Sequence, residues 1–216
     1  MALLTGIVTP VRGRRMRILF VDHEPWRETS AEVAALAGVK EGLVFEPHEL
    51  SERLSELEPR AARERALQLL MYRDRSAHDM TRRLLEDGYP LGVVEQVIAA
   101  MLDSGLLDDQ RFAGALVRVM SEVRGYGRLR ISRELDSHGI DPEVASEALD
   151  EVFSEDEEYA SALRLATALA ARPAIDVQRI AARLARKGFR TGTAFKAARE
   201  ALAAADHGDG SEQGFS

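Results

Sequence analysis

The chain has 216 residues, of which 45% are apolar, which suits one elongated domain or two small ones with a buried core. It contains no cysteine, which excludes disulfides, thiolate metal sites and cysteine nucleophiles and fits a cytoplasmic location. Its net charge of −7, from 29 basic and 36 acidic residues, argues against a uniformly positive nucleic-acid-coating protein. No signal-peptide pattern and no run of about 18 apolar residues occurs, so we expect no contact with a membrane.

The first 60 residues carry short β-prone runs. Three of them, GIVTPV, RILFVD and PWRET, are separated by the turn-like sequences RGRR and DHEP, which predicts a small antiparallel sheet with two hairpin connections. Ser30 is expected to cap a short helix that ends at Gly38, and residues 47–59 are predicted to form a helix between two prolines. Trp26, the only tryptophan, is the expected anchor of this small core.

From residue 61 onward the chain repeats one pattern three times. The stretches SAHDMTRRLLEDGY, GRLRISRELDSHGI and DVQRIAARLARKGF align on Gly88, Gly139 and Gly188. The aligned apolar positions lie eight before, four before and one after each glycine: Met80, Leu84 and Tyr89, then Ile131, Leu135 and Ile140, then Ile180, Leu184 and Phe189. Apolar residues at i and i+4, followed by glycine, predict an amphipathic helix whose C′ glycine turns the chain back onto the same core.

Each aligned stretch is preceded by one helical pattern and followed by another, so the repeating unit has three helices. Asp141 with Pro142 marks one start of the following helix, and Thr191 can cap another. The apolar face of that helix is expected at Val94, Val97, Met101 and Leu102, then Ala145, Ala148, Val152 and Phe153, then Ala194, Ala197, Ala201 and Leu202. Ser76 with Asp79 resembles a capping box, with aspartate in place of glutamate.

The predicted fold is mainly α: a curved, elongated tandem array of three three-helix repeats after a small β-containing segment, because such a unit buries little by itself. The expected boundaries are 1–60 for the N-terminal segment, 61–110, 111–153 and 154–205 for the repeats, and 206–216 for a disordered tail rich in glycine and polar residues.

The sequence offers no constellation typical of catalysis. The five histidines are far apart, no phosphate-binding G-x-x-x-x-G-K-[ST] run occurs, and the acidic clusters precede predicted helices, where they favour the helix dipole. The GYG at residues 125–127 lacks a preceding strand, and we interpret it as a sharp turn between helices. We therefore expect no enzyme activity, catalytic residue, metal, cofactor or small-molecule substrate.

Arginine is the residue type that suggests a binding surface. Residues 154–205 form the only net basic segment, with 9 basic and 6 acidic residues, and Arg179, Arg183 and Arg186 form one stripe opposite Ile180 and Leu184. Either this is a solvated face, or it contacts phosphates or acidic side chains of a partner. The candidate partner-binding residues are Arg73, Arg75, Arg82, Arg128, Arg130, Arg179, Arg183, Arg186, Lys187 and Arg190.

The motifs resemble those of the RecX family, bacterial regulators of the RecA recombinase. The resemblance rests on RSAHDMTRRLLEDGY, on the linker MLDSGLLDDQRFA and on GYGRLRISRELDSHGI. The linker is the most specific piece, matched by Leu107, Asp108, Asp109, Arg111, Phe112 and Ala113. The likeness covers about residues 62–205, and residues 21–45 more weakly resemble the N-terminal extension of longer members.

This resemblance implies a modular three-helix array that binds the RecA filament, can also touch single- or double-stranded DNA within or beside it, and limits filament growth, ATP hydrolysis and strand exchange. The acidity of this chain departs from a protein that binds bare DNA tightly, since such binding depends on phosphate neutralisation. Two alternatives stay open: a helix-turn-helix protein that binds DNA directly, and a helical scaffold for an unrelated protein.

Overall fold

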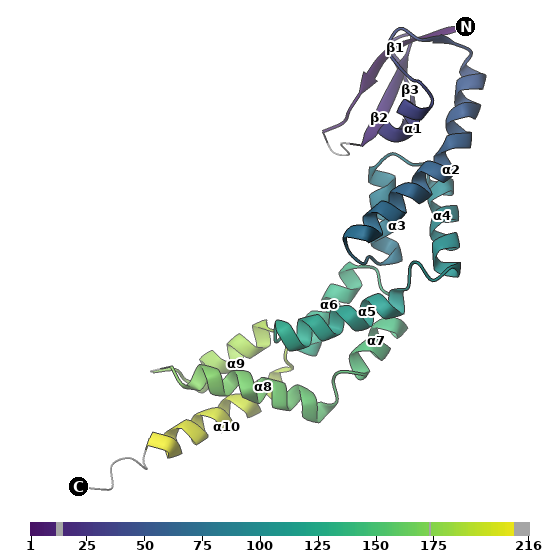
Figure 1. Ribbon diagram of the computed structural model, residues 1–216. Coiled ribbons are helices and arrows are strands. Elements are labelled where there is room, and N and C mark those ends of the chain that lie inside the picture. Colours follow the sequence, from purple (N-terminus) through teal and green to yellow (C-terminus); the bar gives the residue numbers. More distant parts are fainter. Residues whose placement is uncertain (12–14, 173, 210–216) are drawn as a thin grey trace. The chain divides into compact units, whose positions relative to one another are not determined.

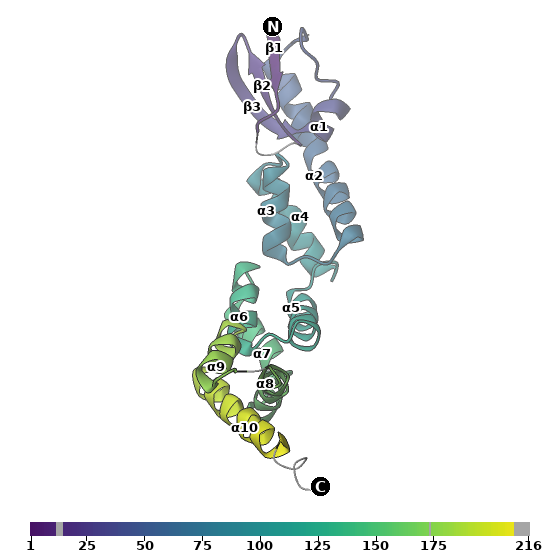
Figure 2. The ribbon, with the colours of Figure 1, turned by 90° about the vertical axis from the view of Figure 1, so that its left-hand side faces the viewer.

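The protein is described by a computed structural model that covers residues 1–11, 15–172 and 174–209 (Figure 1). It forms two compact units, Met1–Asp108 (unit 1) and Asp109–Ser216 (unit 2). Unit 1 contains the only strands of the described residues, while unit 2 is helical throughout its described part (Figure 2). In the described part of the chain no helix is long and apolar enough to span a membrane.

Unit 1 begins with an antiparallel sheet in the order β3-β2-β1-β4. The strands are β1 (Ala2–Val8), β2 (Met16–Val21), β3 (Glu24–Ser30) and the unpredicted β4 (Val44–Phe45). The two predicted hairpin connections are confirmed, although residues 12–14 of the first turn lie outside the described residues. Helix α1 (Ala31–Leu36) follows directly, and the Ser30 hydroxyl accepts the backbone N–H of Val33 at 3.1 Å, as predicted.

The sheet and the first three-helix copy share a single apolar core. Leu4 and Leu19 of the sheet are fully buried in the same cluster as Met80 and Leu84 of the first copy. Trp26 instead lies half-buried at the rim of the core, with its ring centroid 5.4 Å from that of Phe45. The expectation that Trp26 anchors this core was therefore wrong, because aliphatic residues of two adjacent strands fill its centre.

Helix α2 (Pro47–Tyr72) joins two segments that the sequence suggested were separate. Pro59 lies inside this helix, so the expected break after residue 59 is absent and the expected boundary at residue 60 falls within a continuous helix. Proline removes one helical hydrogen bond, but burial of Leu54 before it and Ala62 after it holds both halves against one core.

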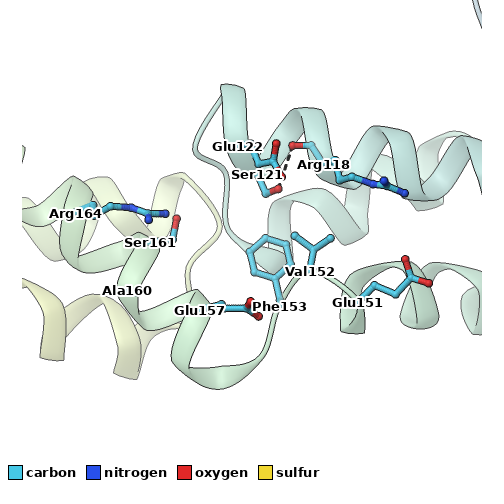
Figure 3. Close-up of a pocket in the computed structure, with 10 residues that line it drawn as sticks. All are labelled: Arg118, Ser121, Glu122, Glu151, Val152, Phe153, Glu157, Ala160, Ser161 and Arg164. Carbon is cyan, nitrogen blue, oxygen red and sulfur yellow. Dashed lines mark hydrogen bonds between the residues drawn. The ribbon is translucent and has the colours of Figure 1, made fainter.

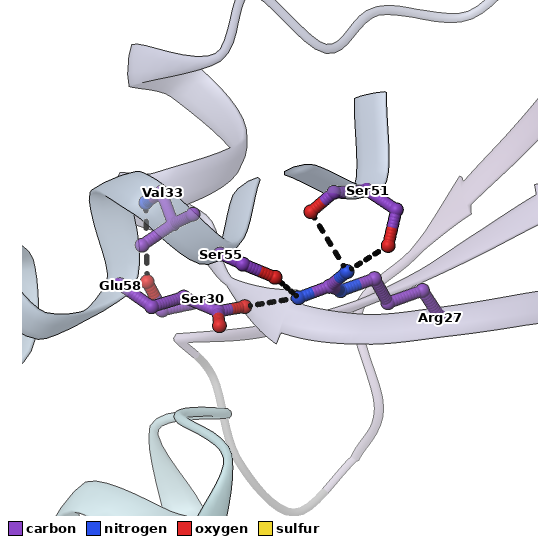
Figure 4. Close-up of polar contacts among 6 residues, drawn as sticks. All are labelled: Arg27, Ser30, Val33, Ser51, Ser55 and Glu58. Carbon is purple, nitrogen blue, oxygen red and sulfur yellow. Dashed lines mark hydrogen bonds and ion pairs between the residues drawn. The ribbon is translucent and has the colours of Figure 1, made fainter. Parts of the chain in front are cut away.

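A half-buried arginine, Arg27, links β3 to α2 (Figure 4). The Arg27 guanidinium donates to the Ser51 hydroxyl at 2.7 Å and the Ser55 hydroxyl at 3.0 Å, and it forms an ion pair with Glu58 at 2.9 Å. The Glu58 side chain is 2% exposed, so this pair is shielded from solvent and fixes the first half of α2 on the sheet.

The three copies are confirmed as three-helix units. The first uses α2, α3 (Ala77–Glu86) and α4 (Leu91–Asp103); the second uses α5 (Asp109–Arg118) with a π-helical turn η1 (Val119–Val123), α6 (Arg128–Ser137) and α7 (Pro142–Asp150); the third uses α8 (Glu155–Ala170), α9 (Val177–Arg186) and α10 (Thr191–Asp209). Helix α10 starts at Thr191 itself and continues beyond residue 205, while residues 210–216 of the predicted tail lie outside the described residues.

The nine aligned apolar positions are all buried, at 4% exposure or less. The predicted face of each third helix is largely buried, but Leu102 is 42% exposed and Leu202 is only partly buried. Val152, partly buried, and Phe153, buried, lie beyond the end of α7. Ser76 caps α3 as expected by accepting the N–H of Asp79 at 3.1 Å, and Asp141 caps α7 by accepting that of Glu143 at 2.8 Å.

The middle helix of every copy ends in the same hydrogen-bonded turn. In the third copy the Gly188 N–H donates to the carbonyl of Ala185 at 2.9 Å, and the Phe189 N–H donates to that of Leu184 at 3.2 Å. The equivalent pairs occur after α3 and α6, and all three turn glycines have positive φ. This is the Schellman arrangement, in which the residue after glycine folds back onto the core, as the sequence predicted.

The second and third copies meet through two glycines. The Gly127 N–H donates to the Lys187 carbonyl at 2.9 Å, and the Leu129 N–H donates to the Gly188 carbonyl at 3.0 Å. No side chain caps α6, because its N-cap is Gly127, so the turn of the third copy supplies an acceptor to the first turn of this helix. A Cβ on Gly188 would lie 2.4 Å from the Cβ of Arg130. Glycine at position 188 is thus required by the close approach as well as by φ.

One buried ion pair links the first and second helices of the first copy. Arg65 Nε donates to an Asp87 carboxylate oxygen at 2.7 Å, and the two side chains are 8% and 2% exposed. Arg83 also approaches this carboxylate, at 3.1 Å. Asp87 follows the last residue of α3, so the pair fixes the position of the glycine turn that comes next.

We expect the substitution Gly188→Ala to destabilise unit 2 by about 2–4 kcal/mol, because the new Cβ requires a strained φ of +94° and displaces the backbone at Arg130. Urea unfolding followed by circular dichroism measures the loss. Gly192→Ala in α10 is the matched control, since its Cβ would meet nothing within 4 Å. Equal losses in the two variants would contradict the proposed role of the contact.

A second expectation concerns the buried pair in unit 1. Asp87→Ala leaves Arg65 buried without its carboxylate and should cost about 3–5 kcal/mol in unfolding free energy, the range for breaking a buried pair. Glu64→Ala removes the exposed ion pair with Arg60 on the same helix and should change stability little. If both substitutions have the same small effect in thermal and urea unfolding, the buried pair is not a structural determinant of unit 1.

Candidate functional site

The predicted cationic residues come together most clearly in unit 2. A pocket of about 480 Å³, here called the basic pocket, is lined by Tyr126, Arg130, Leu165, Ala168, Leu169, Arg172, Arg183, Leu184, Arg186 and Lys187. Four of these residues belong to the predicted set, and they come from the second and third copies. Five lining residues are basic and none is acidic.

One wall of the basic pocket is fixed by the junction of the two copies. The Arg130 guanidinium lies 4.0 Å from the centroid of the Tyr126 ring and donates to the Arg186 carbonyl at 3.4 Å. Lys187 Nζ lies 5.2 Å from the same centroid and donates to the Arg124 carbonyl at 2.8 Å. These two cations therefore help to hold the junction, in addition to contributing positive charge.

The other three cations of the basic pocket have no such structural partners. Arg183 and Arg186 extend from α9 and Arg172 follows α8, and none of them makes an ion pair within the described residues. Since no carboxylate lines the pocket, their charge is not offset locally. Guanidinium groups in this setting can bind carboxylates or phosphates bidentately.

The floor of the basic pocket is apolar. Leu165 and Leu169 of α8 are partly buried, and Leu184 of α9 is fully buried in the core of the third copy. The pocket can thus hold an anion together with an apolar group. Among the described residues no group of three or more His, Asp or Glu side chains is arranged to hold a metal ion.

The remaining predicted residues of unit 2 lie elsewhere. Arg179 pairs with Asp176 at 3.5 Å, so the predicted stripe on α9 is divided between the pocket and the start of the helix. Arg128 pairs with Asp150 at 2.7 Å. Together with Arg190 it lines a second pocket, of about 380 Å³, whose other lining residues include an acidic one.

In unit 1 the three predicted arginines form a cluster of their own. A pocket of about 370 Å³ is lined by Leu69, Arg73, Arg75, Asp79, Arg82, Arg83 and Glu86. Two of its cations are neutralised: Arg82 pairs with Asp79 at 2.8 Å, and Arg83 approaches Glu86 at 3.6 Å. This unit 1 cluster carries less uncompensated charge than the basic pocket.

Arg75 is the member of the unit 1 cluster in the least favourable environment. Its pKa is lowered, first by desolvation and then by repulsion from Arg73, while Asp79 acts in the opposite direction. Its Nε atom is buried with no hydrogen-bond partner in the described structure. An anionic group of a partner beside the guanidinium would favour its charged form.

Another pocket of unit 2, somewhat larger than the basic pocket, is a poorer candidate for binding an anionic partner. It measures about 530 Å³, lies beside η1 and the end of α7, and has side chains of both charges (Figure 3). Arg118 and Arg164 are matched by Glu122, Glu151 and Glu157, and none of the predicted residues lines it. With three carboxylates against two guanidinium groups, this pocket has no excess positive charge to attract an anion.

The predicted set of partner-binding residues does not include Arg172, Arg83 or Tyr126. Arg172 follows the helical pattern of α8 with no periodic neighbour, and Tyr126 occurred only as the centre of GYG. Arg83 stands beside Arg82, but its place in the cluster depends on the packing of α3 on α2. The GYG sequence followed by RLR was the only sequence feature that could have indicated the contact between the Tyr126 ring and the Arg130 guanidinium.

Family models match the two copies that the linker joins. Residues 62–100 match the first three-helix domain of RecX, and residues 108–149 match the second. A crystal structure of a regulatory protein RecX covers 93% of this chain and all of its own, with a TM-score of 0.62 and 21% identity, which supports the fold.

Proteins named regulatory protein RecX align over different lengths. The protein of Stenotrophomonas maltophilia strain R551-3 is 37% identical over 87 residues, 40% of this chain, so the chain spans about half (53%) of that relative. The protein of Corynebacterium efficiens is 32% identical over 162 residues, covering 71% of this chain and 77% of the relative. With both domain models matched and this long alignment in place, the chain belongs to the RecX family of regulatory proteins.

Proposed function

We propose that the chain regulates the RecA recombinase, mainly as an inhibitor, by binding the RecA–DNA filament and limiting its growth, ATP hydrolysis and strand exchange. Its RecX family membership supports a regulatory role. The observation that carries the proposal is the basic pocket, in which five cations converge without an acidic neighbour on a chain of net charge −7. Such local concentration of charge favours a partner with matching acidic groups over general polyanion binding.

The unit 1 cluster gives the chain a second cationic contact. Arg73, Arg75 and Arg82 lie in one unit and the basic pocket lies in the other, so each unit can engage an acidic site. A filament presents the same surface on successive protomers. Two weak contacts on one chain then reinforce each other, because the second forms at the high effective concentration created by the first.

Direct reading of DNA is less well supported by the described side chains. The third helix of the second copy, α7, carries Glu143 and Glu147 and no basic residue. In a helix-turn-helix protein this helix would lie close to phosphates, which its carboxylates would repel. We therefore propose that the chain contacts DNA only within or beside the RecA filament.

The test is the rate of ATP hydrolysis by the cognate RecA on single-stranded DNA, titrated with the chain at fixed salt. The wild-type chain should inhibit. The double substitution Arg183→Glu with Arg186→Glu should raise the concentration for half-inhibition at least tenfold, because each lost charged contact is worth about 1.5–3 kcal/mol. Combining it with Arg75→Glu in unit 1 should weaken inhibition further.

The matched control changes charge equally elsewhere in unit 2. Arg179 lies in the first turn of α9 and Arg199 is exposed on α10, and neither residue lines the basic pocket. This pair should inhibit as the wild type does. The absence of inhibition and of filament binding by the wild-type chain would refute the proposed function, and binding to bare DNA that persists at moderate salt would favour a direct DNA-binding protein.

A further inference from the structure

The basic pocket differs from a simple cationic patch because its floor is apolar. Leu165 and Leu169, which are partly buried, line it together with the fully buried Leu184. A phosphate group requires only donors and positive charge, and it gains nothing from leucine. A ligand that uses the whole pocket must therefore carry an apolar group among its negative charges.

The cations of the pocket divide into a fixed wall and a free set. Arg130 and Lys187 are held beside Tyr126 by backbone carbonyls, whereas Arg172, Arg183 and Arg186 make no ion pair with the described residues. Each of the free guanidinium groups can donate two hydrogen bonds to a carboxylate in a bidentate pair. Several carboxylates a few residues apart would match three such groups.

The single aromatic ring of the pocket does not offer a stacking platform. Tyr126 already has the Arg130 guanidinium 4.0 Å and the Lys187 ammonium 5.2 Å from its ring centroid. Single-stranded nucleic acid is usually held by bases stacked on available aromatic rings together with a basic groove along the backbone. The basic pocket has the charge of such a site but lacks the free ring.

We propose that the basic pocket binds a short acidic peptide segment that carries one apolar side chain and belongs to a protein partner. The apolar side chain lies on the leucine floor, and carboxylates on either side pair with Arg172, Arg183 and Arg186. This deepens the proposed function, on which it rests only for the source of the peptide, the protein part of the filament. Peptide binding itself can be measured with the chain alone.

The test measures fluorescence anisotropy of a labelled, capped peptide, Asp-Asp-Leu-Asp-Asp, on the full chain. Its partner peptide replaces leucine with serine at the same charge. We expect the leucine peptide to bind about tenfold more tightly, the effect of burying most of one apolar side chain. Single-stranded oligothymidine about 15 nucleotides long serves as the nucleic-acid probe.

Substitutions in the basic pocket test whether the peptide binds there. Arg183→Glu and Arg186→Glu should each lower the affinity for the leucine peptide about tenfold, because each removes one charge-assisted contact. Ala168→Asp places a carboxylate on the exposed lining of the basic pocket and should also lower the affinity for the leucine peptide. Arg179→Glu is the matched control on the same helix and should bind as the wild type does, and circular dichroism confirms that every variant is folded.

Equal affinity for the leucine and serine peptides would overturn the inference, because the floor would then contribute nothing. Tighter binding of oligothymidine that displaces the peptide and depends on the same arginines would overturn it in favour of a nucleic-acid site. Absence of peptide binding by a chain that inhibits RecA would refute this inference alone. Peptide binding by a chain that does not inhibit RecA would support it and refute the proposed function.

Discussion

The structure of unit 2 depends on one backbone contact between two glycine-containing turns. The carbonyl of Gly188 accepts the Leu129 N–H at the start of α6, and this approach is possible only because neither Gly127 nor Gly188 has a Cβ. The same contact brings Arg130 of the second copy beside Arg186 and Lys187 of the third. The basic pocket is thus a consequence of how the two copies join, because the backbone contact places basic residues of both copies next to one another.

Electrostatics explains why this pocket stands out in an acidic chain. Several arginines elsewhere are paired with a carboxylate: Arg27 with Glu58, Arg65 with Asp87, and Arg128 with Asp150. The basic pocket lacks any acidic lining, and like charges held together raise the free energy of the isolated chain. Only a ligand of opposite charge relieves this cost, which gives the pocket a specificity that its size alone would not.

Local rules predicted the repeated elements, whereas contacts distant in sequence decided the rest. The buried positions of the middle helices follow from spacing of four residues and a C′ glycine, both of which act within one helix. The continuity of α2 across Pro59 requires packing against α1, α3 and α4, in a core that the sheet shares. Arg172 and Tyr126 join the basic pocket only through tertiary contacts, so no periodic pattern could identify them, while Arg179 fitted the pattern but is paired elsewhere.

The N-terminal sheet covers the glycine turn of the first copy, as the start of α6 covers that of the third. In the third copy the glycine turn after the middle helix rests on the first turn of α6. In the first copy the equivalent Gly88 rests on β3, where an added Cβ would lie 2.7 Å from the carbonyl oxygen of Thr29. Because repeats need a neighbour to cover the surface that they leave open, an array requires a different structure at its end. The sheet, joined to the first copy by a common core and by Arg27, provides that cover for unit 1.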